Sequence, residues 1–167
     1  MIMFEVFDNV MPRDHFEDEY MILKTGTGWS FRGVSVEKDN IGFWHYDLME
    51  RPFYTSFMFN EIQRMTGKQF ELNNVYANGQ TYGLCGDMHV DDHRENARTF
   101  LIYMNPVWDA RWGGNTVLYK DNKVYNYVPV PNTAIMFNSN ISHYGSEPTR
   151  HCKELRITVA FKLMLKE

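Results

Sequence analysis

Eight short segments with strand character follow one another after Phe70, and they constrain the fold more than any other feature of the sequence. Each is rich in β-branched or aromatic residues and is bounded by turn residues, as strands of all-β folds are. The segments span approximately residues 70–77, 86–90, 98–104, 116–120, 123–128, 133–137, 142–146 and 156–165. Asp121-Asn122 lies between two of them and predicts a hairpin. The sequence therefore predicts a mainly β (α+β) domain, built as a double-stranded β-helix (jelly roll) or a related barrel.

The N-terminal part of the chain predicts two helices that support this core. Residues 12–24 carry charged and apolar side chains at helical spacing, and Gly26 and Gly28 end that pattern. A second helix is expected from Pro52 through Met65, with Gly67 as its C-terminal cap. We expect both helices to pack against one sheet.

Between these helices, residues 30–36 predict a short strand and residues 39–51 predict a loop. A chain of 167 residues without an internal repeat or linker has the size of one domain. We therefore expect one domain over residues 1–167, with helical support in 1–69 and the jelly-roll core in 70–167.

His89, Asp91 and His143 form the candidate metal site. Side chains two residues apart in an extended strand point to the same face, so His89 and Asp91 can reach one ion. Two imidazoles and one carboxylate leave open coordination positions, as in non-haem Fe(II) oxygenases. Taken alone, an H-x-D pair is more often a hydrogen-bonded loop motif, and His93 is a competing ligand because it lies two residues beyond Asp91.

The C-terminal segment alternates with a period of two. One face carries Arg156, Thr158, Ala160 and Lys162, and the other carries Ile157, Val159, Phe161 and Leu163. Such a polar face can lie in water at a sheet edge. Alternatively, an inward guanidinium can bind a dicarboxylic acid, because arginine pairs with a carboxylate through two parallel hydrogen bonds.

A second alternating segment, residues 98–105, places Thr99, Leu101 and Tyr103 on one face and Phe100, Ile102 and Met104 on the other. The Tyr103 phenol can contact a cofactor, or it can lie in the core with its hydroxyl bonded to the backbone.

Several motifs in a fixed order resemble the Fe(II)/2-oxoglutarate-dependent dioxygenases, in particular the prolyl-4-hydroxylase-like branch. They cover roughly residues 70–165 and read Asn74-Val-Tyr76-Ala-Asn-Gly79, His89-Val-Asp91, Tyr103-Met-Asn-Pro-Val-Trp108, Trp112-Gly-Gly114-Asn, Pro129 to Phe137, Ser142-His143 and Arg156-Ile-Thr158. The resemblance implies a jelly-roll dioxygenase that uses Fe(II), 2-oxoglutarate and O2, with ascorbate as a further candidate cofactor.

The resemblance also implies roles for individual residues. His89, Asp91 and His143 would ligate the iron, and Arg156 would hold the distal carboxylate of 2-oxoglutarate. The interval between His143 and Arg156 is longer than is usual in the family, and Arg150 lies within it as a rival clamp. We favour Arg156, because Arg150 falls in a turn-like sequence.

Other positions matched by the resemblance would complete the site. Tyr103 and Thr158 would assist Arg156, and Tyr76 would lie near the other end of the cosubstrate. The barrel interior would be lined by Tyr76, Leu101, Tyr103 and Ile135. Aromatic surfaces for a substrate are expected at Tyr82, Trp112 and Trp44.

The expected reaction is hydroxylation of a substrate C–H bond with release of succinate and CO2. The branch implies a peptide or protein substrate and a peptidyl prolyl hydroxylase. Two alternatives remain: an oxygenase of a small metabolite or nucleobase, and a non-catalytic cupin-like metal-binding module. The cupin motif usually begins H-x-H, whereas this chain has Asp91 at the second position.

Composition restricts the partners and the location. The formal net charge of −4 and the lack of Lys/Arg runs argue against nonspecific nucleic-acid binding. Cys85 and Cys152 form neither a disulfide framework nor a CxxC pair, which favours reduced thiols in the cytoplasm. The sequence shows no secretory segment or apolar membrane span, so no membrane association is expected, and it carries no indication of oligomeric state.

Overall fold

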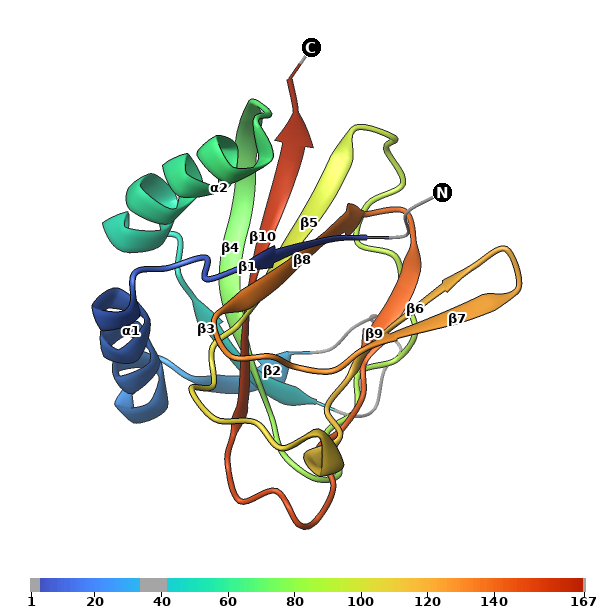
Figure 1. Cartoon of the computed structure of the whole chain (residues 1–167). Helices are drawn as coiled ribbons and strands as arrows, with labels where there is room; N and C mark the ends of the chain where they lie inside the picture. The colour runs from blue at the N-terminus through green and yellow to red at the C-terminus, as the bar shows by residue number, and fades with distance from the viewer. Residues whose placement is uncertain (1–3, 34–41, 167) are drawn as a thin grey trace.

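Ten strands form two antiparallel sheets in this computed structural model, which describes residues 4–33 and 42–166 (Figure 1). The larger sheet has seven strands in the order β1-β8-β5-β10-β4-β3-β2, and the smaller has three in the order β7-β6-β9. The strands are β1 (Glu5–Asp8), β2 (Ser30–Gly33), β3 (Phe43–Asp47), β4 (Phe70–Gln80), β5 (Ala97–Tyr103), β6 (Thr116–Lys120), β7 (Lys123–Tyr127), β8 (Thr133–Asn138), β9 (Ser142–Gly145) and β10 (Arg156–Leu165).

The two sheets pack face to face through a small apolar cluster. Tyr103, Ile135 and Phe137 come from the large sheet, and Leu118 comes from the small one. Most strands that follow one another in sequence are not hydrogen-bonded neighbours. In the large sheet, for example, β5 lies between β8 and β10. This arrangement is the predicted double-stranded β-helix.

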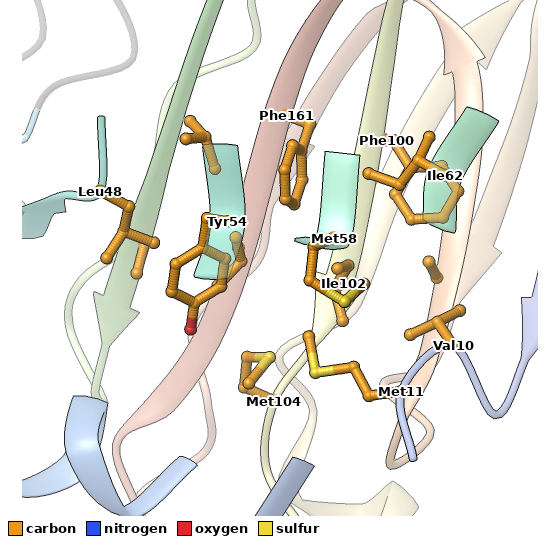
Figure 2. Packing of buried hydrophobic residues seen from close by; sticks show 14 of the residues in the cluster. Val10, Met11, Leu48, Tyr54, Met58, Ile62, Phe100, Ile102, Met104 and Phe161 are labelled. Atoms are coloured by element: carbon orange, nitrogen blue, oxygen red, sulfur yellow. The ribbon is translucent and has the colours of Figure 1, made fainter. Parts of the chain in front are cut away.

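The opposite face of the large sheet is covered by helices. α1 (Arg13–Thr25) and α2 (Phe59–Thr66) lie on this side, and α2 continues a π-helical segment, η1 (Phe53–Met58) (Figure 1). Tyr54, Met58 and Ile62 from η1 and α2 pack against Phe100 and Phe161 of β5 and β10, as Figure 2 shows. Both helices were expected, and they support one sheet as predicted.

Turn residues at two boundaries behave as their sequence predicts. Gly67 ends α2 in the left-handed conformation with φ 67°, and its amide donates to the Gln63 carbonyl. Asp121 and Asn122 both have positive φ, 50° and 57°, and join β6 to β7. A two-residue connection with this geometry matches the twist of an antiparallel hairpin.

The structure corrects three expectations about strands. The segment predicted as a strand at residues 86–90 makes only an isolated bridge, between His89 and His143. The predicted loop at 39–51 contains β3, which pairs with β4. β1 was not expected, yet it forms one edge of the large sheet beside β8. Residues 34–36 and 39–41 of the predicted strand and loop lie outside the described residues.

A short 3-10 helix, η2 (Ala110–Trp112), interrupts the connection between β5 and β6. None of the helices formed by the described residues is both long and apolar enough to cross a membrane.

Candidate metal centre

A pocket of about 440 Å³ is lined by the inner face of the large sheet and by residues of β6 and β9 in the small sheet. β4, β5 and β10 each contribute every second residue to its wall, because alternate side chains of a strand share a face. The alternating face of β10 supplies Arg156, Thr158, Ala160 and Lys162, all of which line the pocket. This face, polar in the sequence, therefore points inward and not to the solvent.

His89, Asp91 and His143 converge in this pocket. One potential ligand atom from each lies within 4.8 Å of the others. Nε2 of His89 is 3.4 Å from Oδ1 of Asp91, and Nε2 of His143 is 3.4 Å from Oδ2. Among the described residues, these three form the one group of histidine, cysteine and acidic side chains whose ligand atoms lie close enough to hold a metal ion.

Backbone hydrogen bonds bring these distant residues together. His89 and His143 exchange both backbone bonds, His89 N to His143 O at 3.0 Å and His143 N to His89 O at 2.8 Å. The amide of Asp91 donates to the carbonyl of Ser139 at 2.9 Å. The segment that carries His89 and Asp91 is thereby fixed along β9 although it forms no regular strand.

Both imidazole rings are oriented by carbonyl groups. Nδ1 of His89 lies 2.9 Å from the carbonyl oxygen of Asp87, and Nδ1 of His143 lies 2.8 Å from that of Ile141. Because a carbonyl only accepts hydrogen bonds, Nδ1 carries the proton in each ring, and Nε2 keeps its lone pair. Histidine ligands of metals are commonly oriented in this way.

The Asp91 carboxylate is buried and strongly bonded. Thr99 donates its hydroxyl to Oδ2 at 2.6 Å, and the Lys162 ammonium forms an ion pair with the same oxygen. Burial acts to raise the pKa of Asp91, but Lys162 and the two histidines outweigh it and hold the pKa far below its usual range. Asp91 is thus an anion at every physiological pH.

The same contacts shift the pKa values of its partners. Burial acts to lower the pKa of His89, but the nearby Asp91 carboxylate and the Asp87 carbonyl favour its charged form and give a net rise. Burial also acts to lower the pKa of Lys162, and nearby Tyr76 and Asp91 reverse that effect. Two imidazole nitrogens with free lone pairs and one permanent carboxylate are a donor set that fits a divalent first-row metal ion such as Fe(II).

Arg156 is buried in the same pocket, with 2% of its surface exposed. Its Nε donates to the Gly114 carbonyl at 2.5 Å, one terminal nitrogen to Gln80 Oε1 at 2.7 Å and the other to Thr116 Oγ1 at 3.3 Å. These contacts use three of the five N–H groups of a guanidinium. One N–H remains on each terminal nitrogen, and a carboxylate can accept hydrogen bonds from both terminal nitrogens of a guanidinium.

Burial lowers the pKa of Arg156, but a guanidinium remains charged inside proteins. The Tyr103 ring lies 5.9 Å from its central carbon, and the Tyr103 hydroxyl donates to Thr116 Oγ1 at 2.7 Å. Arg156 is therefore a fixed cation whose direction is set by surrounding polar groups.

Not every residue expected around the cosubstrate lines the pocket. Tyr76 and Thr158 do, together with Leu101. Tyr103 and Ile135, which were expected in the lining, belong instead to the apolar cluster between the sheets. Tyr103 is fully desolvated there, which raises its pKa, and it reaches the pocket only through Thr116 and Arg156.

The three aromatic residues expected at the substrate surface lie outside the pocket. Tyr82 is exposed and receives a hydrogen bond from Arg150 at 3.1 Å. Trp112 packs edge-on against Trp108. Trp44 lies between Phe43 and His45 on β3, and because those two line the pocket, Trp44 points to the opposite face.

Arg150 and His93, the alternative candidates for the carboxylate clamp and the metal ligand, also lie outside the pocket. Arg150 is exposed and its guanidinium lies 5.2 Å from the Tyr82 ring centroid. His93 is exposed and does not belong to the metal-ligating group. Arg156 thus has a position in the pocket that Arg150 lacks.

Sequence reasoning missed part of the pocket wall. Phe43 and His45 were assigned to a loop. Aromatic residues are common in strands, and in a strand Phe43 and His45 share a face that Trp44 does not. Asn78 and Gln80 continue the alternation that begins at Tyr76 on β4, beyond the predicted end of that strand. Lys162 was placed on the same face as Arg156 but was given no role.

The sequence profile of the 2OG-Fe(II) oxygenase superfamily matches residues 72–162, more than half of the chain. No curated protein sequence matches the chain.

Solved structures with the same fold include a Trichoplax adhaerens prolyl hydroxylase in complex with a hypoxia-inducible-factor peptide. It has 18% identity, covers 97% of this chain and 83% of its own, and has a TM-score of 0.75. A Pseudomonas putida prolyl-4-hydroxylase has 12% identity, coverage of 99% and 94%, and a TM-score of 0.70. A non-haem alpha-ketoglutarate-dependent epimerase from nogalamycin biosynthesis has 10% identity, coverage of 97% and 77%, and a TM-score of 0.70.

At these identities the structural neighbours establish the double-stranded β-helix fold. The profile match covers β4 from Leu72, β5, the segment with His89 and Asp91, His143 on β9, and β10 as far as Lys162. It therefore spans the whole candidate metal centre and Arg156, and the chain belongs to the 2OG-Fe(II) oxygenase superfamily.

Proposed function

We propose that this protein is an Fe(II)- and 2-oxoglutarate-dependent dioxygenase that hydroxylates a C–H bond of its substrate and releases succinate and CO2. One oxygen atom of O2 enters the substrate and the other enters succinate. The observation that carries the proposal is one pocket that holds the His89, Asp91 and His143 ligand atoms together with the two free N–H groups of Arg156.

In this proposal each residue has a defined role. His89, Asp91 and His143 hold Fe(II), which supplies the centre at which O2 and the 2-oxo acid react. Arg156 binds the distal carboxylate of 2-oxoglutarate, and Gln80, Gly114 and Thr116 fix the direction of its guanidinium. The distance between Arg156 and the ligands then selects a diacid of suitable length.

Other wall residues contribute by shape and by excluding water. Tyr103 supports Thr116 and Arg156 from behind, while Thr158 and Tyr76 line the cosubstrate space. Phe43, Leu101 and Phe137 provide apolar wall, which limits side reactions of an oxidising centre with water.

We further propose that the substrate is a prolyl residue in a peptide or protein. The support is the order of motifs, which resembles the prolyl-4-hydroxylase-like branch, and the fold shared with two prolyl hydroxylases. An extended proline-rich segment is already close to its bound conformation, so binding it costs little conformational entropy.

A small-molecule substrate is the second candidate, and the pocket wall favours it. His45, Asn78, Gln80 and Lys162 give the wall a polar character, whereas the aromatic residues Tyr82, Trp112 and Trp44 lie outside. An epimerase that acts in nogalamycin biosynthesis shares the fold.

The test is incubation with Fe(II), ascorbate and 2-oxoglutarate in the presence of proline-containing peptides, free proline, nucleosides or sugars. We expect a peptide product that has gained one oxygen atom on proline, by mass spectrometry, with an equal amount of succinate. Stoichiometric succinate with a nucleoside, sugar or free amino acid alone would reject the prolyl substrate and keep the reaction class.

A further inference from the structure

The Asp91 carboxylate has two oxygens with very different surroundings. Oδ2 accepts the Thr99 hydroxyl at 2.6 Å and pairs with the Lys162 ammonium. Each oxygen also has one imidazole Nε2 at 3.4 Å, that of His89 beside Oδ1 and that of His143 beside Oδ2, so the histidines do not distinguish the two oxygens. A carboxylate oxygen offers about two lone-pair directions, so the two donors occupy those of Oδ2 and leave those of Oδ1 for another partner.

The two donors come from paired positions on neighbouring strands. Thr99 of β5 and Lys162 of β10 are direct cross-strand partners. Side chains directly opposite each other on one face of a sheet have Cβ atoms about 4.5–5.5 Å apart, so both can reach one atom above the sheet. The register of the large sheet therefore determines the surroundings of Oδ2.

Each donor is itself held in place. Thr99 Oγ1 lies 3.0 Å from Ser139 Oγ, and because Thr99 gives its proton to Asp91, Ser139 is the donor in that contact. Ser139 also accepts the Asp91 amide through its carbonyl. The Lys162 ammonium lies 5.6 Å from the Tyr76 ring centroid, a cation–π distance.

A local irregularity accompanies Lys162. The pairing of β10 with β4 shifts between Lys162 and Leu163, so that one residue of β4, Asn73, has no partner across the ladder. Such bulges redirect side chains near functional sites. The pairing with β5 has no such shift, so the relation between Lys162 and Thr99 is preserved.

We propose that Thr99 and Lys162 are positioning residues that reserve Oδ2 of Asp91, so that the carboxylate presents Oδ1 to the metal as a single-atom ligand. The inference rests on the proposed metal site. Contacts of this kind to a metal ligand typically change metal affinity by about 10- to 100-fold.

Lys162 could also affect the metal in the opposite direction, through its positive charge. An ammonium near a divalent cation repels it, so a lysine that acted only through its charge would weaken metal binding. Positioning and repulsion therefore predict opposite changes when Lys162 is replaced by an uncharged side chain of similar length.

The experiment measures Mn(II) binding to the full chain without 2-oxoglutarate, by the loss of the electron paramagnetic resonance signal of free Mn(II). We expect Thr99→Val and Lys162→Met each to raise the Kd about 10- to 100-fold. Thr99→Ser and Lys162→Arg, which keep a donor, should bind nearly as wild type does. Thermal unfolding of the metal-free variants checks that each is folded.

Matched controls come from positions away from Asp91. Thr133→Val removes a buried hydroxyl that donates to the Val130 carbonyl, and Lys123→Met removes an exposed ammonium on β7. Both should leave the Mn(II) Kd unchanged.

Two failures can be distinguished. Tight Mn(II) binding by wild type together with equal or tighter binding by folded Thr99→Val or Lys162→Met would overturn the positioning role alone. Wild type that binds Mn(II) no more tightly than His143→Ala would overturn the metal site itself and this inference with it.

Discussion

At the scale of single residues, Arg156 is a buried cation whose orientation is fixed by its neighbours. Gly114, Gln80 and Thr116 accept three of its hydrogen bonds and hold the guanidinium plane, while two N–H groups remain. A carboxylate that fills this position forms charge-assisted bonds in a site with little water, where such bonds are strongest.

We expect Arg156→Ala to raise the apparent KM for 2-oxoglutarate about 10- to 100-fold, because a hydrogen bond to a charged group contributes roughly 1.5–3 kcal/mol. Tyr103→Phe should act in the same direction but less, since Tyr103 touches Arg156 through Thr116. Steady-state kinetics of succinate formation measures both.

The matched control for this change is Arg150→Ala, which removes an exposed guanidinium that contacts Tyr82. Its KM for 2-oxoglutarate should equal that of wild type. A large increase for Arg150→Ala with none for Arg156→Ala would move the carboxylate clamp to the turn before β10.

The sequence singled out candidate residues by type and spacing, and it gave no role to residues whose contacts depend on the fold. The spacing of His89 and Asp91, and the alternation at Arg156, were visible along the chain. The contact of Thr99 and Lys162 with Asp91 depends on which strands are neighbours and in what register. Periodicity within one strand carries no information on that pairing.

The aromatic residues expected at a substrate surface lie outside the pocket, and their role stays a prediction. Trp44 and Trp112 have side chains suited to a substrate surface, but an aromatic ring serves equally well in packing. The direction of Trp44 followed from β3, a segment interpreted from the sequence as a loop although three of its five residues are aromatic.

At the scale of elements, the turn before β6 sets the position of Arg156. Gly114 has φ 69°, and a Cβ placed there would lie 2.9 Å from Cδ of Arg156. Gly67, at the end of α2, has a nearly equal φ of 67°, and a Cβ at that position would have no neighbouring atom within 4 Å. The two glycines therefore share a backbone requirement and differ in their neighbours.

We expect Gly67→Ala to lower the free energy of unfolding by about 1–2 kcal/mol, the cost of a left-handed conformation for alanine. Gly114→Ala should lower it by more, because its Cβ would also lie 2.9 Å from atoms of Arg156 and Trp108. Only Gly114→Ala should also raise the KM for 2-oxoglutarate, because its methyl group displaces Arg156. Denaturant unfolding and kinetics of both variants test this. An unchanged KM in folded Gly114→Ala would contradict the role of this turn.

The helix that supports the large sheet offers a second test at this scale. Ile62 of α2 is fully buried in the core cluster between helices and sheet (Figure 2). Ile62→Ala should lower the free energy of unfolding by about 2–5 kcal/mol. Arg64→Ala on the exposed face of the same helix should change it by no more than about 0.5 kcal/mol; equal effects of the two variants in urea unfolding would contradict this packing.

Elements with strong local signals were predicted well, and those stabilised by neighbours were not. The α2 boundary at Gly67 and the Asp121-Asn122 hairpin follow from residue preferences at single positions. β1 has four residues, mostly exposed, and is a strand because it pairs with β8. The segment around His89 was expected to be a strand but is fixed by a few bonds to β9 and Ser139.

At the scale of the whole molecule, the large sheet separates two environments. Its outer face is covered by helices and is apolar, and its inner face carries the polar pocket and the second cluster. The fold class was accessible from the number and spacing of strand-like segments. The strand order was not, because it joins β1, β8 and β5, which lie far apart in sequence.

Ligand binding links the site to the stability of this framework. A metal that binds only the folded state stabilises it by about 2.7 kcal/mol at a free concentration of 100 times Kd. The chemistry of the pocket, however, is tested most directly by the identity of the residues that turnover requires.

That measurement is succinate formation from 2-oxoglutarate with Fe(II) and O2 by wild type, Asp91→Ala and His93→Ala. Asp91 lies within the ligand group, and His93 is an exposed histidine two residues away. We predict that Asp91→Ala abolishes turnover, because among the described residues no other carboxylate belongs to the ligand group, and that His93→Ala retains wild-type turnover. Wild-type turnover in Asp91→Ala, with loss in His93→Ala, would contradict the proposed metal centre.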